Sequence, residues 1–544
     1  MTAASKSFAE WQDYAKTLDP VHVSWLKQAK TSKTKFAIAD IVGVEIPHDR
    51  FLTGVLLFSK KIKVISPEQN VGLLLPSSAG GAITTMAILS LGKTIVNLNF
   101  TAGKKALQSA VEQADIKHIY SSRKFFDKMY EKGVDLASFF PSTEVLFLED
   151  IKEEISSLSK IAYLLSAKLM PVGMIRKLFF KEVAPNDTAA ILFSSGSEGA
   201  PKGVELSHSN IAANAKQCAI AMDANSTDVM MSTLPPFHAF GFAITTLMPL
   251  AEGIPLVCHP DPTDVTTIAL GVEKYHGTIL IGTPTFLRMY AINKKVSVKS
   301  MQSLRLVAAG AEKLRAEVRN AFETKFNKVI YEGYGTTETS PAVSINLPDD
   351  ASGVRSRVGT VGRLLEGTAF LIVDPDSLEP LPTGEDGLIL MSGPQLMKGY
   401  LNMPEKTAEA IEIIDGYRWY RSGDKGHLDE DGYLTIVDRY SRFAKIGGEI
   451  VSLTAVEEQI LDALKNQDLE VAAICMPDQR KGERIILLAT QGATKELVLK
   501  ALKKAKVNPL YHPAKVYSVE EIPKLGSGKI DFSATKKIAL AHIE

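Results

Sequence analysis

The sequence predicts an α/β fold: a large N-terminal domain of mostly parallel sheets covered by helices, with a small antiparallel β part, followed by a small mobile α+β C-terminal domain. Short β-branched runs alternate with helical stretches through most of the chain, which favours parallel sheets with helices on both faces. The length of 544 residues exceeds that of a typical single domain several times over. From about Gly353 onward, turn signals such as Asp386-Gly387 become frequent and separate short strands, a pattern typical of antiparallel sheets.

The N-terminal domain is expected to comprise residues 1–439. Two stretches within it, 69–92 and 229–251, contain no Asp, Glu, Lys or Arg. Because proline and glycine interrupt both, we interpret them as buried strand–turn–helix units and not as membrane spans. The parallel strands are predicted from β-branched runs at residues 71–75, 94–98, 189–193, 278–281, 305–309 and 328–331.

The last part of the chain is expected to contain two further units. Residues from about 353 to 439 are expected to form the antiparallel β-rich part of the N-terminal domain. Residues 440–544 are expected to form the separate α+β domain, since a segment of this length can bury a core of its own. Within it, strands are predicted at 471–475 and 485–489 and amphipathic helices at 453–464 and 494–505.

Composition and charge exclude several classes of protein. With 45% hydrophobic and 23% charged residues, the chain is neither disordered nor collagen-like. The 62 Lys and Arg residues balance the 62 Asp and Glu residues, so no overall positive field attracts nucleic acid and none is predicted as a partner. Cys218, Cys258 and Cys475 form neither a disulfide framework nor a spaced metal site. Since the first residues also lack the pattern of a signal peptide, the sequence predicts a cytoplasmic protein.

One segment, from Ile155 to Lys181, combines many apolar residues with five Lys and Arg residues and contains no acid. Pro171 and Gly173 are expected to split it into two short helices. Basic amphipathic helices lie on anionic membrane surfaces, which predicts peripheral contact with the inner face of the cytoplasmic membrane. The alternative is a helical cover over the core with a basic edge in solvent. The sequence leaves both interpretations open.

The strongest chemical signal is the string Ile-Leu-Phe-Ser-Ser-Gly-Ser-Glu-Gly-Ala-Pro-Lys-Gly-Val at residues 191–204. A buried strand runs into small residues whose backbone N–H groups can approach phosphate oxygens, while a lysine neutralises charge. The string differs from the Walker loop, in which the Lys-Ser/Thr pair opens a helix directly. The residues predicted to form this phosphate site are Ser194, Ser195, Gly196, Ser197, Glu198, Gly199 and Lys202. The role of Glu198 stays open, because its carboxylate would repel phosphate unless Mg²⁺, Lys202 or an outward rotamer offsets the charge.

This string resembles the phosphate loop of the adenylate-forming superfamily, which includes acyl-CoA synthetases, luciferases and the adenylation domains of peptide synthetases. Five further motifs resemble those of the superfamily and follow in its order. They are Leu-Pro-Pro-Phe-His-Ala-Phe-Gly at 234–241, Gly-Ala-Glu at 310–312, Tyr-Glu-Gly-Tyr-Gly-Thr-Thr-Glu-Thr at 331–339, Tyr-Arg-Ser-Gly-Asp at 420–424 with Asp-Arg at 438–439, and Pro-Lys-Leu-Gly-Ser-Gly-Lys at 523–529. The resemblance covers the chain from roughly Val71 to Lys537.

The resemblance implies a role for each motif. Lys529, Thr337 and His238 correspond to catalytic positions, Glu338 to the Mg²⁺ ligand, and Ser441 to the hinge of the C-terminal domain. The residue types suit such roles, because Mg²⁺ is held by one or two carboxylates beside substrate phosphates. The positions implied to contact ATP or the thiol cofactor are Gly310, Ala311, Glu312, Glu332, Gly333, Tyr334, Thr337, Asp424, Arg439, Lys445, Gly447 and Gly448.

Two departures from the superfamily pattern narrow the resemblance. Glu198 stands where most relatives carry threonine, and the loop Arg-Phe-Ala-Lys-Ile-Gly-Gly-Glu at 442–449 contains a Gly-Gly pair. Both match the synthetase half of bacterial acyltransferase/acyl–acyl-carrier-protein synthetases. The resemblance then implies ATP-dependent activation of a fatty acid to an acyl-adenylate, followed by thioester formation on the phosphopantetheine of acyl carrier protein.

Two other functions stay open at this stage. A long-chain fatty acid–CoA ligase shares the first half-reaction and differs in the thiol carrier. A non-catalytic lipid-binding or membrane-scaffold protein could use the same fold without the chemistry. Because carrier proteins are acidic, lysines of the C-terminal domain are expected to contact the carrier, with a solvated helix face as the alternative: Lys495, Lys500, Lys503, Lys504 and Lys506.

Overall fold

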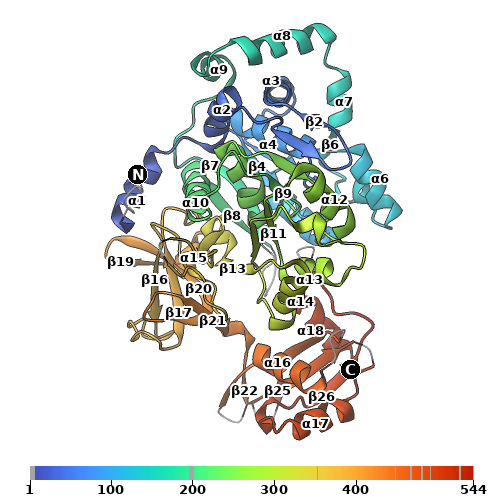
Figure 1. Ribbon diagram of the computed structural model, residues 1–544, viewed down its shortest axis with the longest axis vertical. Coiled ribbons are helices and arrows are strands. Elements are labelled where there is room, and N and C mark those ends of the chain that lie inside the picture. The colour runs from blue at the N-terminus through green and yellow to red at the C-terminus, as the bar shows by residue number, and fades with distance from the viewer. Residues whose placement is uncertain are drawn as a thin grey trace.

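The computed structural model describes residues 7–194, 201–351, 353–446, 449–465, 469–478, 482–490, 492–525 and 529–542. Figure 1 shows three regions along the long axis. The blue-to-yellow part of the chain forms the largest body, an orange β-rich part lies beside it, and the red C-terminal part lies at the far end. Strands and helices alternate through the largest body, so the predicted α/β fold class is confirmed.

The first large sheet contains the strand that leads into the predicted phosphate loop. Among the described residues it has seven strands, of which β7, β4, β3, β5 and β6 run parallel, while β8 and β18 are added antiparallel at one edge. In spatial order the strands are β18 (Gly399–Tyr400), β8 (Lys202–Ser207), β7 (Thr188–Ser194), β4 (Thr94–Asn97), β3 (Asn70–Leu73), β5 (His118–Ser121) and β6 (Glu144–Phe147).

The second large sheet carries most of the remaining motifs. In the described part of the chain it has nine strands, and the six central ones run parallel. In spatial order they are β15 (Arg363–Leu364), β14 (Ala342–Ile345), β13 (Ile330–Gly335), β12 (Leu306–Ala309), β11 (Ile279–Gly282), β9 (Met230–Ser232), β10 (Leu256–Cys258), β1 (Ile38–Asp40) and β2 (Glu45–Ile46).

Helices surround these two sheets (Figure 1). Their starts follow local capping chemistry: the Ser78 hydroxyl, for example, accepts a hydrogen bond from the backbone N–H of Gly81 at 3.2 Å, where α4 begins. The helices of this body are α1 (Phe8–Thr17), α2 (Val21–Thr31), α3 (His48–Ile65), α4 (Ala79–Ser90), α5 (Lys104–Gln113), α6 (Arg123–Glu131), α7 (Leu148–Glu153), α8 (Ser157–Leu169), α9 (Val172–Phe179), α10 (His208–Ala221), α11 (Met248–Glu252), α12 (Val265–Tyr275), α13 (Pro284–Ile292) and α14 (Ala316–Phe326).

The β-rich part expected after about residue 353 is present as an antiparallel sheet. Its strands are β16 (Ala369–Val373), β17 (Gly387–Ser392), β20 (Tyr417–Leu428), β19 (Ile411–Ile414) and β21 (Leu434–Arg439), with helix α15 (Pro404–Ala410) between β18 and β19. Strands β20 and β21 pair directly, which places Asp424 opposite Arg439. This pairing brings two halves of one predicted motif together.

The C-terminal part has a sheet and an apolar core of its own. Two clusters of buried apolar side chains consist, among the described residues, only of residues beyond Arg439. The boundary at residues 439 and 440 stays a prediction. The elements are β22 (Phe443–Ile446), β23 (Glu449–Ser452), α16 (Leu453–Leu464), β24 (Val471–Asp478), β25 (Gly482–Ala489), α17 (Lys495–Lys504), β26 (Lys515–Ser518) and α18 (Phe532–Ala541).

The individual sequence predictions agree with the structure to within a few residues. Each of the six predicted parallel strands corresponds to an observed strand, and the predicted helix at 453–464 has the bounds of α16. The split at Pro171 is confirmed, because α8 ends at Leu169 and α9 begins at Val172. No helix among the described residues is sufficiently long and apolar to cross a membrane.

The stretch 229–251 differs from a simple strand–turn–helix. After β9 the chain forms a π-helix, η2 (Phe240–Leu247), before α11. Gly241 makes this possible, since a side chain there would place its Cβ 2.1 Å from the carbonyl oxygen of Pro235. A π-helix is rare and is frequently found at functional sites.

Candidate functional site

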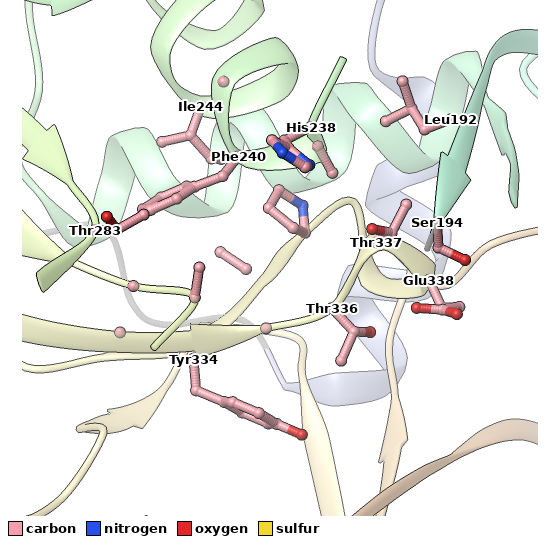
Figure 2. A pocket seen from close by; sticks show the side chains of 18 of the residues that line it. Leu192, Ser194, His238, Phe240, Ile244, Thr283, Tyr334, Thr336, Thr337 and Glu338 are labelled. Carbon is pink, nitrogen blue, oxygen red and sulfur yellow. The ribbon is translucent and has the colours of Figure 1, made fainter. Parts of the chain in front are cut away.

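A cavity of about 470 Å³ lies where the two large sheets, the β-rich sheet and the C-terminal part meet. The end of β7, the π-helix η2, the ends of β11, β12 and β13, and the loop containing Lys529 all contribute to its wall. Figure 2 shows Ser194, Thr337 and Glu338 on one side and Phe240 with Ile244 on the opposite side. The cavity therefore has a polar end and an apolar end.

The polar end is built on a short 3-10 helix, η4 (Thr337–Thr339), and on the hairpin of β7 and β8. Glu338 is only 9% exposed, and its Oε1 accepts a hydrogen bond from the Tyr400 hydroxyl at 2.9 Å. The hairpin pairs Ser194 with Lys202, and the Lys202 ammonium lies 5.0 Å from the centre of the Tyr400 ring. Hydroxyls, one cation and one carboxylate thus converge within the same part of the cavity.

The centre of the predicted phosphate loop lies outside the described residues. The structure describes its two flanks, Ser194 and Lys202, which both line the cavity. The predicted contacts Ser195, Gly196, Ser197, Glu198 and Gly199 fall within the undescribed stretch. Their roles stay predictions.

Tyr334, Asp424 and Arg439 form one hydrogen-bonded unit at the edge of the cavity. The Tyr334 hydroxyl donates to Oδ2 of Asp424, and the Arg439 Nε donates to Oδ1 of the same carboxylate at 2.9 Å. Burial and the neighbouring Asp424 carboxylate raise the pKa of Tyr334 well above its ordinary value, so its hydroxyl keeps its proton. Tyr334 and Arg439 line the cavity, and Asp424 stands directly behind them.

Three ionisable groups lie close together beside the loop that contains Lys529, and two of them have a buried polar atom without a hydrogen-bond partner among the described residues. His238 is buried, and burial together with the positive charge of Lys529 lowers its pKa to about 3. In the described part of the chain neither Nε2 of His238 nor Oε1 of Glu312 has a hydrogen-bond partner. Burial, followed by the charge of Arg439, lowers the pKa of Lys529, while burial raises the pKa of Glu312. Buried polar atoms without partners are uncommon in native proteins, so these groups are positioned to interact with a bound ligand.

Four of the predicted contact residues that the structure describes do not line the cavity: Glu312 and Asp424 lie directly beside its wall, whereas Glu332 and Lys445 are engaged elsewhere. The Glu332 carboxylate accepts hydrogen bonds from the backbone N–H of Leu314 at 3.0 Å and from Arg319 Nη2 at 2.6 Å, so it braces the segment before α14. Lys445 lies exposed on β22, where its backbone N–H donates to Glu483. The neighbouring Gly447 and Gly448 lie outside the described residues.

The other predicted site residues are brought together from distant parts of the chain. Glu312 lies next to the cavity wall through its neighbour Ala311, and its Oε2 accepts a hydrogen bond from the Thr285 hydroxyl at 2.7 Å. The predicted residues that line the cavity are Ser194, Lys202, His238, Gly310, Ala311, Gly333, Tyr334, Thr337, Glu338, Arg439, Ser441 and Lys529.

The apolar end was not identified from the sequence. Its lining comes from elements that are far apart in the chain, and only Phe240 belongs to a predicted motif, the one at 234–241: Cys218, Ala221, Met222, Phe240, Ile244, Ile281, Ala308, Ile345 and Leu365. The only sequence signal was the long apolar stretch 229–251, which supplies the π-helix. Helix packing against the sheet, rather than a local pattern, creates this part of the cavity.

The last turn of α10 closes the apolar end and is held by two arginines. Arg305 Nη1 donates to the carbonyl of Met222 at 3.1 Å, and Arg355 Nη2 donates to the carbonyl of Ala221 at 2.8 Å. Arg305 is itself held by the Asp228 carboxylate through two contacts of 2.7 Å. Both guanidinium groups thus bind backbone carbonyls that a helix end leaves without partners.

Comparisons with known proteins give a consistent result. The family described as AMP-binding enzyme matches residues 58–401. The long-chain-fatty-acid–CoA ligase of Bacillus subtilis is 25% identical over 484 residues, which cover 85% of this chain and 84% of the ligase. The 4-coumarate–CoA ligase 1 of Arabidopsis thaliana is 30% identical over 358 residues, which cover 64% of this chain and 63% of that ligase.

A similar fold is found among solved structures. The anthranilate CoA ligase AuaEII in complex with anthranoyl-AMP superposes with a TM-score of 0.80 at 21% identity, covering 97% of this chain and 98% of that one. At this identity the likeness concerns the fold, and it includes both the large N-terminal and the small C-terminal part.

Proposed function

Because the chain belongs to the AMP-binding enzyme family, we propose that it is an AMP-forming acid–thiol ligase that activates a fatty acid with ATP and transfers it to acyl carrier protein. One observation carries this proposal: a single cavity joins a polar end, where the residues predicted to bind phosphate lie, to an apolar end suited to an acyl chain. The carboxylate of the acid would lie between them, near Thr337 and His238 (Figure 2).

The polar end fits a nucleotide. Tyr334 offers a flat ring, and the Asp424 carboxylate behind it can accept from ribose hydroxyls while Arg439 holds it in place. Ser194 and Lys202 flank the predicted phosphate loop. We infer that ATP binds with its base at Tyr334 and its phosphates toward Lys202.

The residues present also fit a magnesium ion. One oxygen of Glu338 is held by Tyr400, and in the described residues the other has no hydrogen-bond partner. Mg²⁺ usually takes one or two carboxylates and completes its shell with substrate phosphates and water. Glu338 would hold the ion, which would neutralise phosphate charge.

In the first step, a carboxylate oxygen of the acid attacks the α-phosphorus of ATP, the bond to pyrophosphate breaks, and acyl-adenylate forms. Negative charge then builds on the α-phosphate and on the departing pyrophosphate. The Lys529 ammonium and the Thr337 hydroxyl are the groups we expect to stabilise it, because both line the cavity at this point.

The lining supports a long apolar acid. In the described part of the wall the charged side chains are Lys202, Glu338, Arg439 and Lys529, and none of them belongs to the elements that form the apolar end. The opposite end is enclosed by α10, the π-helix and β11. An acyl tail buried there would gain roughly 0.8 kcal/mol per CH₂ group.

In the second step a thiol attacks the acyl carbonyl, and AMP leaves. We propose that the C-terminal part turns about Ser441, which lines the cavity, and so admits the phosphopantetheine arm. Acyl carrier protein as the acceptor is supported by an exposed basic surface on and after α17. It contains Lys495, Lys500, Lys503, Lys504 and Lys506. CoA is the rival acceptor, because the similar proteins are named as CoA ligases.

One assay tests the proposal. Purified protein is incubated with ATP, Mg²⁺ and radiolabelled palmitate, with either CoA or phosphopantetheinylated acyl carrier protein as acceptor. We expect palmitate-dependent ATP–pyrophosphate exchange without acceptor, and labelled thioester on the carrier protein. Thioester on CoA alone would assign the rival acceptor. Absence of exchange with fatty and aromatic acids alike would contradict the proposed chemistry and favour a binding or scaffold role.

A further inference from the structure

Helices α8 and α9 expose an unusual concentration of apolar side chains. Of the 21 large apolar side chains that are exposed in the described part of the chain, six lie within residues 158–178. Single exposed apolar residues are ordinary in monomeric proteins, whereas a contiguous cluster marks an interaction site. The six are Leu158, Ile161, Leu165, Leu169, Met174 and Leu178, and Leu158 and Leu169 are 80% and 76% exposed.

These side chains share a face on each helix. Leu158, Ile161, Leu165 and Leu169 follow one another at intervals of three or four residues along α8, and Met174 and Leu178 are four apart on α9. Residues with this spacing lie on one side of a helix. We call the six residues the apolar face.

Another side of each helix is fixed to the body of the protein. Ala167 of α8 and Ile175 of α9 are 2% and 0% exposed. The Lys30 ammonium of α2 donates to the carbonyls of Ala167 at 2.6 Å and Lys168 at 2.9 Å, and Lys168 pairs with Asp49 of α3 at 3.3 Å. The apolar face is therefore held outward and cannot turn into the core.

Cations flank the apolar face, and acids are missing from it. Lys160, Arg176, Lys177 and Lys181 are exposed, and in the part of the chain that the structure describes none of them pairs with a carboxylate. Lys60 of α3 adds a further cation, 5.7 Å from the Tyr163 ring of α8. No Asp or Glu occurs from Ile155 to Lys181. Apolar side chains flanked by cations fit a binding partner that has an apolar interior and an anionic outer layer.

We propose that α8 and α9 dock this protein, peripherally and reversibly, on an anionic lipid bilayer. The apolar face enters the acyl region, and the flanking cations contact lipid phosphates. In Figure 1 the two helices lie at the end of the molecule opposite to the C-terminal part, which stays free in solution to meet a thiol carrier. The inference does not depend on the proposed ligase activity, since docking requires no ATP.

The test is co-sedimentation of the full-length protein with vesicles of phosphatidylcholine containing phosphatidylglycerol. We expect binding to these vesicles, much weaker binding to phosphatidylcholine alone, and release by high salt. The triple variant Leu158→Ser, Leu165→Ser, Leu178→Ser should bind the anionic vesicles at least about tenfold more weakly than the wild type. Its matched control replaces Leu270, Ile292 and Val298 by Ser, since these are also exposed but lie on α12, α13 and the following loop.

A second variant tests the flanking cations by reversing their charge. Arg176→Glu, Lys177→Glu, Lys181→Glu should also weaken binding about tenfold, whereas Lys495→Glu, Lys500→Glu, Lys504→Glu on α17 should leave it unchanged. Lys168 is left intact because it pairs with Asp49. Thermal unfolding checks that each variant is folded, and ATP–pyrophosphate exchange with detergent-dispersed acid reports on the ligase separately.

Two outcomes would overturn the inference. Wild-type protein that stays in the supernatant with anionic vesicles would exclude docking. A dimer in analytical ultracentrifugation that the serine variant dissociates, with vesicle binding unaffected, would assign the apolar face to a second copy of the chain.

Discussion

Replacing Lys529 by alanine removes the only charge that the described C-terminal residues place on the cavity wall. Burial and the nearby charge of Arg439 lower the pKa of this lysine. A charge held in a site that largely excludes water interacts more strongly with a negative ligand than it would in water. Loss of one such preorganised group costs about 2.7–4 kcal/mol, which corresponds to about 100- to 1,000-fold in rate. We expect this loss in acyl-adenylate formation.

The second half-reaction should respond differently. If Lys529 stabilises charge only while the adenylate forms, transfer from preformed acyl-adenylate should fall by less than about threefold. ATP–pyrophosphate exchange measures the first step, and single-turnover transfer from synthetic acyl-adenylate measures the second. The control is Lys524→Ala, which removes a lysine of the same loop that pairs with Glu470 and does not line the cavity. Equal losses in both steps would refute this division of roles.

Three further predictions follow from the same contacts. Asp424→Ala should raise the KM for ATP about tenfold or more without altering the order of preference among acids; a changed acid profile in competition assays would contradict it. Arg355→Gln removes one hydrogen bond from the end of α10 and should shift kcat/KM toward longer acids, whereas Arg357→Gln, whose guanidinium pairs with Asp429 and Asp431, should not. Burial lowers the pKa of His22 to about 3 and of His208 to about 4. A histidine in the unfolded chain has a pKa of about 6.5, so below this pH the unfolded state takes up a proton at each of the two positions while the folded state does not. The free energy of unfolding should therefore fall by up to about 1.4 kcal/mol per pH unit per histidine as the pH drops from 6.5 toward 4. Denaturant titration at pH 7 and pH 5 measures this, and His22→Phe should reduce the dependence.

The parts of the site that the sequence predicted are short contiguous motifs. The hairpin that brings Ser194 opposite Lys202 is formed within one stretch of chain, and the 3-10 helix carrying Thr337 and Glu338 follows directly from a strand. In such segments neighbouring residues are close in space whatever the rest of the fold does. Strand periodicity and glycine-rich turns predicted the local structure of these segments, whereas their roles in the site are what the resemblance to the adenylate-forming superfamily implies.

The contacts that depend on packing could not be predicted. Glu332 belongs to a predicted motif, yet its carboxylate is captured by Arg319 and by the backbone N–H of Leu314. The apolar end of the cavity is assembled from α10, the π-helix, β11 and β14. No local pattern specifies which of many apolar side chains will face a cavity and which will fill the core.

By itself the sequence determined the α/β class and the order of the elements, because these follow from local periodicity, and its contiguous motifs predicted which residues form the polar half of the site. It also showed that residues 155–181 are apolar and basic, and left open which side of these helices meets solvent. Only the tertiary structure decided this: Ala167 and Ile175 are buried, so the apolar face of α8 and α9 points outward. A helix with apolar residues on several sides can bury any one of these sides. Which side is buried depends on the contacts that the rest of the fold offers, and for α8 these come from Lys30 of α2 and Asp49 of α3.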